Sequence, residues 1–218
     1  MFRLVLKRVV YPILQPFSKW YFSKPRSYRY KDLKVLVKPG VFFPHLTIST
    51  KVLLEYLDQQ NLKDQSVLEL GAGCGIVSFR CAQKNAIVTA SDISSLAIDN
   101  LKANQQTLGL EVKIQKSDLF DSLAEKFDMV IINPPYYPKD PKSDAEKAWF
   151  CGSEFQYFEN LARQLGDHLT EKGFALMILS EDCEIDRIQQ ILKNGRLEMN
   201  EVSMVKRFGE RNFLYRIT

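Results

Sequence analysis

A glycine-rich loop between an apolar strand and a helix constrains the fold of this chain more than any other feature. Residues 66–70 read Ser-Val-Leu-Glu-Leu, and Gly71-Ala72-Gly73-Cys74-Gly75 separates them from a helical pattern over residues 76–84. Strand, glycine loop and helix in this order form the first unit of a nucleotide-binding α/β fold, where glycines let a ligand approach the backbone closely. The loop differs from the dinucleotide fingerprint, because Ile76 stands where the third glycine of that fingerprint would be.

Acidic residues follow the next two predicted strands. Residues 86–90 lead to Asp92, which lies 23 positions after Glu69, and residues 112–115 lead to Asp118. At such strand ends Asp92 can bind ribose hydroxyls, and Asp118 can accept a hydrogen bond from an adenine amino group. Each carboxylate alone is compatible with an ordinary capping or turn role. Their order at successive strand ends favours a nucleotide-like ligand.

The motif Asn133-Pro134-Pro135-Tyr136 follows a fourth predicted strand at residues 127–132. The side-chain carbonyl of Asn133 and the backbone carbonyl of Pro134 can accept the two N–H bonds of an NH2 group, which orients its lone pair and stabilises the positive charge that develops on nitrogen. Tyr136 can lie flat against a planar target group. The simpler interpretation is a plain turn, because Asn-Pro commonly breaks regular structure.

The positive charge of the chain is concentrated at its beginning. Residues 1–31 contain eight Lys or Arg and no acid, while the whole chain has 30 basic and 26 acidic residues. Aromatic residues, Tyr28 and Tyr30 among them, are interleaved with these cations. Such a segment can bind RNA or a ribosome-like surface, lie on an anionic membrane surface, or pack on the domain as a helix with solvated charges. We expect a basic aromatic extension at residues 1–40 and an α/β domain at residues 41–218.

Composition argues against several other classes of protein. A hydrophobic content of 45% with 26% charged residues is ordinary for a soluble globular protein, and no apolar run reaches the roughly 18 residues of a membrane span. The four cysteines lack metal-ligand spacing and only two histidines accompany them. We therefore expect reduced thiols in a reducing compartment and no metal site. His168, on a predicted helix, is expected to be structural or exposed.

Further elements follow from hydrophobic periodicity. Helices are expected at residues 51–59, 93–106, 155–169 and 185–193. Strands are expected at residues 33–37, 174–179, 197–205 and 213–217, with the last two forming an antiparallel pair. Ser49 or Thr50 is expected to cap the first of these helices. Pro44 lies in the segment that leads into this helix. Residues 138–144 are polar and interrupted by proline, which predicts a loop at the mouth of the site.

Together these motifs resemble those of class I S-adenosylmethionine-dependent methyltransferases. The matching segments are residues 67–75, 91–92, 117–120 and 127–136, within a region of about residues 40–218. The Asn-Pro-Pro-Tyr form is similar to amino-group methyltransferases, both the HemK-type protein glutamine enzymes and those that act on nucleic-acid bases. A glycine pair common in the HemK type is reduced to Gly152 here. The resemblance implies a Rossmann-like, doubly wound α/β fold with a seven-stranded, mostly parallel sheet that has one antiparallel strand.

The resemblance also implies roles for individual residues. The positions that match the cofactor site are Glu69, Gly71, Gly73, Asp92, Asp118 and Leu119. Glu69 would lie near the methionine moiety of S-adenosylmethionine, Asp92 at the ribose and Asp118 at the adenine. The positions that match the clamp on the target amine are Asn133, Pro134 and Tyr136.

The implied activity is methyl transfer from S-adenosylmethionine to a planar NH2 nitrogen, on a protein glutamine amide or an RNA base. Two alternatives remain: a non-catalytic binding module on the same scaffold, and a small-molecule methyltransferase. The expected partners are a protein or RNA substrate, with ribosome association and nucleic-acid contact through residues 1–31. A membrane surface is less favoured, and the expected location is cytoplasmic.

Overall fold

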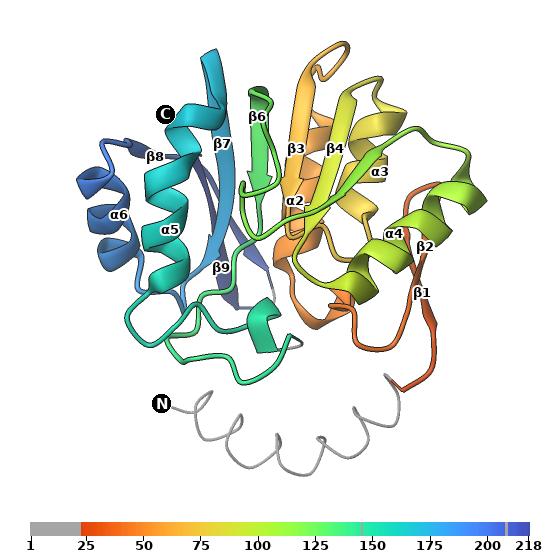
Figure 1. The fold of residues 1–218 in the computed structure, drawn as a ribbon, viewed down its shortest axis with the longest axis horizontal. Helices are drawn as coiled ribbons and strands as arrows, with labels where there is room; N and C mark the ends of the chain where they lie inside the picture. The colour runs from red at the N-terminus through yellow and green to blue at the C-terminus, as the bar shows by residue number, and fades with distance from the viewer. Residues whose placement is uncertain (1–22, 145, 208) are drawn as a thin grey trace.

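A seven-stranded sheet forms the centre of the molecule, and a separate two-stranded hairpin lies beside it (Figure 1). The computed structural model describes residues 23–144, 146–207 and 209–218. The strand order across the large sheet is β5-β4-β3-β6-β7-β9-β8. Its parallel strands are β3 (Ser66–Leu70), β4 (Ile87–Asp92), β5 (Lys113–Lys116), β6 (Phe127–Ile132) and β7 (Leu169–Ser180).

The last two strands close the sheet. Strand β9 (Glu210–Ile217) pairs antiparallel with both β7 and β8 (Met199–Arg207), so β8 runs in the same direction as the five parallel strands. The predicted seven-stranded sheet with one antiparallel strand is therefore confirmed. Arg207 at the end of β8 and Glu210 at the start of β9 are register partners, so the two strands extend further toward one another than the predicted residues 197–205 and 213–217.

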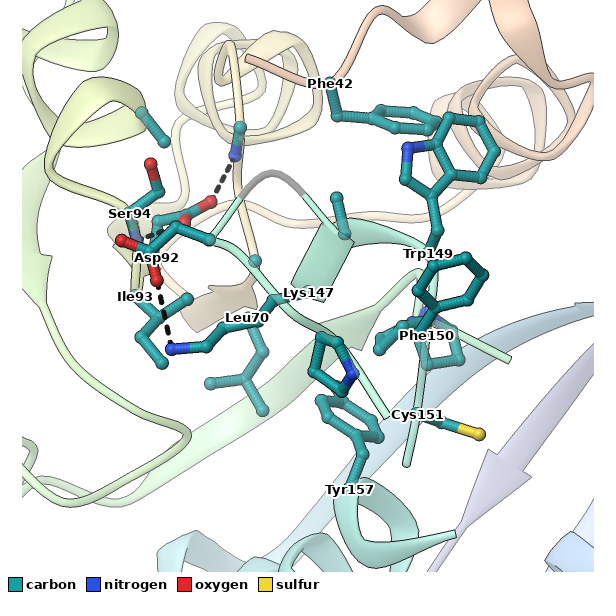
Figure 2. A pocket seen from close by; sticks show the side chains of 18 of the residues that line it. Phe42, Leu70, Asp92, Ile93, Ser94, Lys147, Trp149, Phe150, Cys151 and Tyr157 are labelled. Atoms are coloured by element: carbon teal, nitrogen blue, oxygen red, sulfur yellow. Dashed lines mark hydrogen bonds and ion pairs between the residues drawn. The ribbon is translucent and has the colours of Figure 1, made fainter. Parts of the chain in front are cut away.

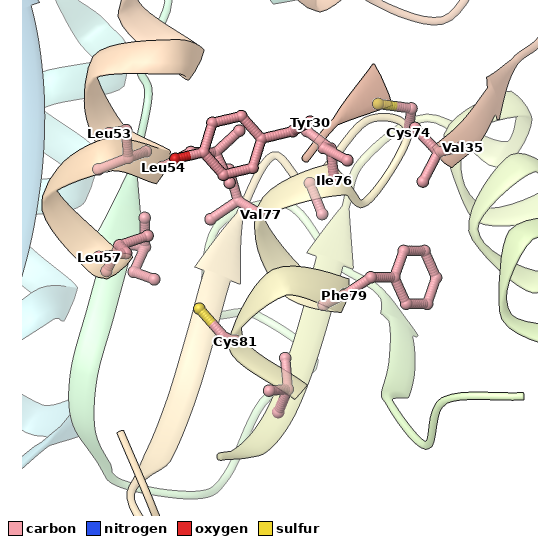
Figure 3. Packing of buried hydrophobic residues seen from close by; sticks show 14 of the residues in the cluster. Tyr30, Val35, Leu53, Leu54, Leu57, Cys74, Ile76, Val77, Phe79 and Cys81 are labelled. Carbon is pink, nitrogen blue, oxygen red and sulfur yellow. The ribbon is translucent and has the colours of Figure 1, made fainter. Parts of the chain in front are cut away.

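Alternate residues of each strand point to opposite faces of the sheet. Both faces are buried because helices cover them. On β3, Val67 packs into one hydrophobic cluster and Leu68 into the other, and on β6 the same holds for Ile131 and Ile132. The first cluster contains residues of α2 (Ser49–Asp58), α3 (Ile76–Gln83) and α4 (Ser95–Leu108). The second contains residues of α5 (Gln156–Gln164) and α6 (Ile185–Asn194). Figure 3 shows the first cluster around the glycine loop, where Cys74 and Phe79 pack.

The hairpin consists of β1 (Arg26–Tyr30) and β2 (Leu33–Val37), paired antiparallel. Its inner face, which includes Tyr28 and Tyr30 at 4% and 6% exposure, belongs to the first hydrophobic cluster. These two rings are therefore not available to stack on bases, and residues 26–30 form a strand rather than part of a packed helix. The other aromatic residues of the predicted extension, at residues 1–22, lie outside the described residues.

Two of the differences from the predicted element boundaries concern helices α2 and α5. Helix α2 begins at Ser49 without a side-chain cap, and the Ser49 hydroxyl donates to Asn212 Oδ1 at 2.9 Å. The predicted capping role of Ser49 or Thr50 is therefore wrong. The helix predicted for residues 155–169 ends at Gln164 and continues as the 3-10 helix η3 (Leu165–His168), after which β7 already starts. Polar residues in the exposed first part of β7 concealed its beginning in the sequence.

Candidate active site

A cavity of about 530 Å³ lies at the carboxyl ends of the parallel strands (Figure 2). The pairing of the strands explains this position of the cavity. Leu70 on β3 pairs with Ser91 on β4 and with Ile132 on β6. The segments that follow these three residues therefore meet at one edge of the sheet. They are the glycine loop, the turn at Asp92 and the Asn-Pro-Pro-Tyr motif.

The cavity brings together eight of the nine residues that the sequence predicted for the site. They are Gly71, Gly73, Asp92, Asp118, Leu119, Asn133, Pro134 and Tyr136. Glu69 is the exception, because it does not line the cavity. Segments more than 60 residues apart in the chain thus line a single cavity, as expected for motifs at successive strand ends.

The glycine loop is held open toward the cavity by its backbone. The amides of Gly71 and Ala72 both donate to the Ser91 carbonyl at 2.9 Å. Gly71 and Gly73 have φ values of 72° and 56°, which L side chains rarely adopt. A Cβ added at Gly71 would meet no atom within 4 Å. Glycine is required at Gly71 by this backbone conformation, and the open space beside it leaves room for a ligand to approach the main chain.

Asp92 is fixed by the backbone on either side of it. Its Oδ2 accepts from the Gly73 amide at 2.9 Å, and its Oδ1 accepts from the Ser94 amide at 2.8 Å (Figure 2). Burial raises the pKa of Asp92, while these two hydrogen bonds act in the opposite direction. The carboxylate is thus oriented before a ligand binds, and its remaining lone pairs can accept from hydroxyl groups.

Glu69 forms hydrogen bonds with Ser78 of α3, the helix that follows the glycine loop. Its carboxylate accepts hydrogen bonds from the Ser78 amide at 2.8 Å and from the Ser78 hydroxyl. Burial raises the pKa of Glu69 to about 8, although the bonds from Ser78 lower it. Glu69 therefore connects the end of β3 to α3, behind the glycine loop rather than inside the cavity.

The opposite side of the cavity contains the Asn-Pro-Pro-Tyr motif. Asn133 and Tyr136 are half-buried and Pro134 is buried. The Tyr136 and Tyr137 rings lie 4.6 Å apart between centroids, tilted by 48°. Burial, with Tyr137 and Cys183 nearby, raises the pKa of Tyr136, and Ser180 lowers it. Tyr136 is consequently a neutral phenol at physiological pH.

Residues 137–144 and 146–152, here called the cover segment, contribute Asp140, Lys147 and Trp149, among others, to the lining of the cavity. The Tyr137 amide donates to the Trp149 carbonyl at 3.1 Å, and the Cys151 amide donates to the Tyr137 carbonyl at 3.0 Å. The Lys139 ammonium lies 4.5 Å from the centre of the Phe150 ring. Within this segment, η2 (Glu146–Ala148) is a short 3-10 helix. The predicted loop at residues 138–144 is part of this segment, and Asp140 lines the cavity as expected for the mouth of the site.

One aromatic contact joins the cover segment to the opposite wall. The rings of Phe42 and Trp149 lie 5.1 Å apart between centroids at 57° (Figure 2). Phe42 belongs to the segment that follows β2, and both residues line the cavity. The sequence did not predict this contact, because it depends on how two loops far apart in the chain are placed.

Sequence reasoning also missed Tyr157, on the first turn of α5. Tyr157 lines the cavity, and burial raises the pKa of its hydroxyl, with Asp118 and Asp92 contributing. Tyr157 therefore lines the same cavity as these two carboxylates. Its position after Gly152 was the only local signal that could have found it.

The charged residues that line the cavity are mostly acidic. Among the described residues they are Asp92, Asp118, Asp140, Asp144 and Lys147. Lys147 forms an ion pair with Asp144 at 3.1 Å. The remaining negative charge and the open glycine loop suit a cationic ligand with a nucleoside part. S-adenosylmethionine is such a ligand, so the residues present fit this cofactor.

The described part of the chain contains no group of three or more His, Cys, Asp or Glu residues placed to hold a metal ion. All four cysteine thiols are free. His168 stacks on Phe120 at 4.4 Å between ring centroids, in agreement with a structural role. Within the same residues, no helix has the length and apolar character needed to span a membrane.

Comparison with known proteins gives relatives of two kinds. The chain is 34% identical over 178 residues to a release factor glutamine methyltransferase from Leptospira interrogans, which covers 72% of this chain and 61% of that relative. It is 30% identical over 115 residues to ribosomal RNA small subunit methyltransferase C from Actinobacillus pleuropneumoniae, covering 51% of this chain and 35% of that relative. The matches thus span from about a third to three fifths of these relatives.

A solved structure supports the fold. The T. thermophilus 16S rRNA N2 G1207 methyltransferase, in complex with AdoMet and guanosine, superposes with a TM-score of 0.63 at 19% identity, over 88% of this chain and 49% of that chain. The profile of the methyltransferase small domain matches residues 32–201, which is most of the chain and includes β2 of the hairpin. The chain belongs to the methyltransferase small domain family.

Proposed function

We propose that this protein is an S-adenosylmethionine-dependent N-methyltransferase that modifies a planar NH2 group. One observation carries the proposal: a single cavity is lined by the glycine loop and Asp92 on one side and by the Asn-Pro-Pro-Tyr motif on the other. A methyl donor on the first side would face an amine on the second. The family and the methyltransferase relatives support this reaction class.

In this proposal the cofactor supplies an electrophilic methyl group on a sulfonium. Asp92 accepts hydrogen bonds from the ribose hydroxyls, and Asp118 accepts one from the adenine amino group. On the other side, Asn133 and the Pro134 carbonyl accept from the two N–H bonds of the target, and Tyr136 packs against its plane. The cover segment excludes water. Most of the rate comes from holding nitrogen and methyl in contact, since effective molarity can supply roughly 7–11 kcal/mol.

The acceptor we propose is a protein glutamine amide or an RNA base amine. One relative's name specifies a release factor glutamine and another's specifies ribosomal RNA, and both groups present a planar NH2 to the motif. Association with the ribosome, nucleic-acid contact through residues 1–31 and a cytoplasmic location belong to the same proposal. The domain division also stays a proposal: a basic extension followed by the methyltransferase domain, with β1 and β2 contributing to the domain core.

Two measurements test the function. Titration calorimetry with S-adenosylhomocysteine should show binding, and the same ligand should raise Tm by mass action. Tritiated methyl groups should then be incorporated into protein or RNA when an extract from a deletion strain is supplied with the purified protein. Cofactor binding without incorporation into any macromolecule or small molecule would favour the non-catalytic binding module. Incorporation only into a small-molecule fraction would favour the other alternative.

A further inference from the structure

The outer face of the β1–β2 hairpin carries positive charges that have no acidic partner. Strand alternation turns Arg29 and Lys34 outward, and both are exposed. Neither makes an ion pair within residues 23–144, 146–207 and 209–218. Lys31 and Asp32 at the turn differ, because Lys31 pairs with Asp58 and Asp32 pairs with Arg80.

Arg29 and Lys34 are also placed directly opposite one another. They are register partners in the antiparallel pair. Like charges at directly opposite positions destabilise a two-stranded pair. A glutamate at either position would relieve this repulsion, and yet the hairpin has two cations there. A loss of hairpin stability from this repulsion is expected where the two cations bind an anionic partner.

The hairpin and the residue that follows it are hydrogen-bonded to α4 beside the cavity. The Asn104 carboxamide oxygen accepts from the Leu36 amide at 2.8 Å, and the Asn100 carboxamide oxygen accepts from the Lys38 amide at 2.6 Å. The chain then continues into Gly40, which lines the cavity. Extended-chain geometry puts Lys34 about 13 Å from Lys38, which follows β2 and precedes the cavity-lining Gly40. A ligand that contacts Lys34 while its amine occupies the cavity must therefore be a polymer rather than a small molecule.

We propose that the outer face of the β1–β2 hairpin binds the phosphodiester backbone of an RNA substrate and directs a base amine into the cavity. This inference rests on the proposed function and selects the RNA acceptor over the protein acceptor. Arg29 and Lys34, which are exposed and directly opposite one another, contact the phosphates. RNA combines a repeating anion with planar NH2 groups, whereas an anionic membrane has only the first feature.

The test uses substitutions that separate binding from stability. Lys34→Glu places opposite charges across the hairpin, so Tm should rise by about 1–3 °C. Its affinity for a fluorescent, mixed-sequence single-stranded RNA of about 20 nucleotides should nevertheless fall about 10-fold at low salt. The double variant Arg29→Glu/Lys34→Glu should also flatten the slope of log Kd against log salt by about 1.4, the value for two lost contacts to a single strand.

The matched control is Lys63→Glu, which makes the same change in net charge at an exposed position before the amino end of β3. It should leave RNA affinity within about 2-fold of the wild type. The proposal is overturned if wild-type protein does not bind the RNA, if Lys63→Glu weakens binding as much as Lys34→Glu does, or if poly-glutamate of equal charge competes as well as unlabelled RNA. It is also overturned if Lys34→Glu weakens binding only to vesicles that contain about one fifth phosphatidylserine.

Measurements on the wild type and on Lys34→Glu distinguish a failure of the RNA-binding proposal from a failure of the proposed methyltransferase function. Lys34→Glu should bind S-adenosylhomocysteine as the wild type does, because the hairpin face lies outside the cavity. Wild-type protein that binds the cofactor but not RNA would refute the hairpin surface and leave the methyltransferase proposal intact. Wild-type protein that binds RNA but not the cofactor would refute the methyltransferase proposal.

Discussion

The two sides of the cavity are built in different ways. On the cofactor side, the glycine loop and Asp92 follow strands that pair in register, and backbone amides fix each group. On the side proposed for the acceptor, Asn133 and its neighbours follow a strand, and further lining comes from the cover segment and from Tyr157 of α5. The cover segment contacts the opposite wall through the rings of Phe42 and Trp149.

This difference separates a preformed site from an adjustable one. Backbone hydrogen bonds inside a seven-stranded sheet leave the cofactor side little freedom to move. The acceptor side depends on loop placement and ring contacts, which open at lower free-energy cost than core strands. A ligand common to many methyltransferases would bind the first side, and acceptor specificity would be set by the second. Substitution of Asn133 should therefore change mainly turnover and substitution of Asp92 mainly cofactor affinity, while loss of the contact between Trp149 and Phe42 should affect how well the cavity retains the cofactor.

The largest effect is expected from Asn133→Ala on the acceptor side. Loss of an acceptor for the N–H bonds of the target should lower turnover by roughly 10²–10³-fold, as for the removal of one preorganised polar group at a transition state. Affinity for S-adenosylhomocysteine should stay close to that of the wild type. The measurement is the initial rate of methyl incorporation, with calorimetry on the same preparation.

Asn194→Ala, at the exposed end of α6, provides the control for loss of a carboxamide far from the cavity. It should leave both quantities unchanged. Asn133→Asp keeps an acceptor oxygen but adds a charge near the sulfonium, so its turnover should lie between those of Asn133→Ala and the wild type. Turnover of Asn133→Ala equal to that of the wild type would remove the proposed amine clamp.

Asp92→Ala should give the next largest effect, on the cofactor side. It removes charge-assisted hydrogen bonds to the ribose and leaves the Gly73 and Ser94 amides without their acceptor. The affinity for S-adenosylhomocysteine should fall about 10–100-fold, corresponding to about 1.4–2.7 kcal/mol. Asp118→Ala is the companion variant, and because Asp118 is exposed its effect should be smaller. An unchanged affinity for Asp92→Ala would separate this carboxylate from the cofactor.

The two sides also differ in how much of them the sequence could predict. Gly71, Asp92 and Asn133 were found because each follows an apolar strand, and parallel strands place their carboxyl ends together. Phe42 and Trp149 lie more than 100 residues apart on irregular segments, so no periodicity connects them. The hairpin was only half predicted: residues 33–37 were expected to form a strand, whereas the cations and aromatic residues before them were compatible with a binding segment or with a helix packed on the domain. Burial of Tyr28 and Tyr30 in the core became visible only in the structure.

A smaller effect is expected for Trp149→Ala, which removes the contact between the cover segment and Phe42. Aromatic pairs contribute about 0.5–1.5 kcal/mol beyond their buried area, so affinity for S-adenosylhomocysteine should fall by about 2–12-fold. Trp149→Phe keeps a ring and should retain most of the affinity. The rate of cofactor dissociation, followed by stopped-flow fluorescence, is the most direct measurement. If Trp149→Ala leaves this rate unchanged, the cover segment does not retain the cofactor.

The smallest effect on binding is expected for Glu69→Gln, and it appears mainly in the pH dependence of stability. The folded-state pKa of Glu69 is about 8, above its ordinary value of 4.5, because burial penalises the charged form. The contribution of this group to stability is therefore fully present below about pH 4.5 and is lost as pH rises toward 8. Gln cannot ionise, and its carbonyl oxygen can still accept from the Ser78 amide.

Tm of the wild type should consequently decline more steeply between pH 5 and 8 than Tm of Glu69→Gln, with the largest difference near pH 8. Thermal unfolding at several pH values measures this difference. The same variant tests the role that the family resemblance gave to Glu69. Because its carboxylate contacts Ser78 and does not line the cavity, S-adenosylhomocysteine affinity should change little. A large loss of affinity, without a change in the pH profile, would instead place Glu69 at the methionine moiety and make it part of the cofactor side.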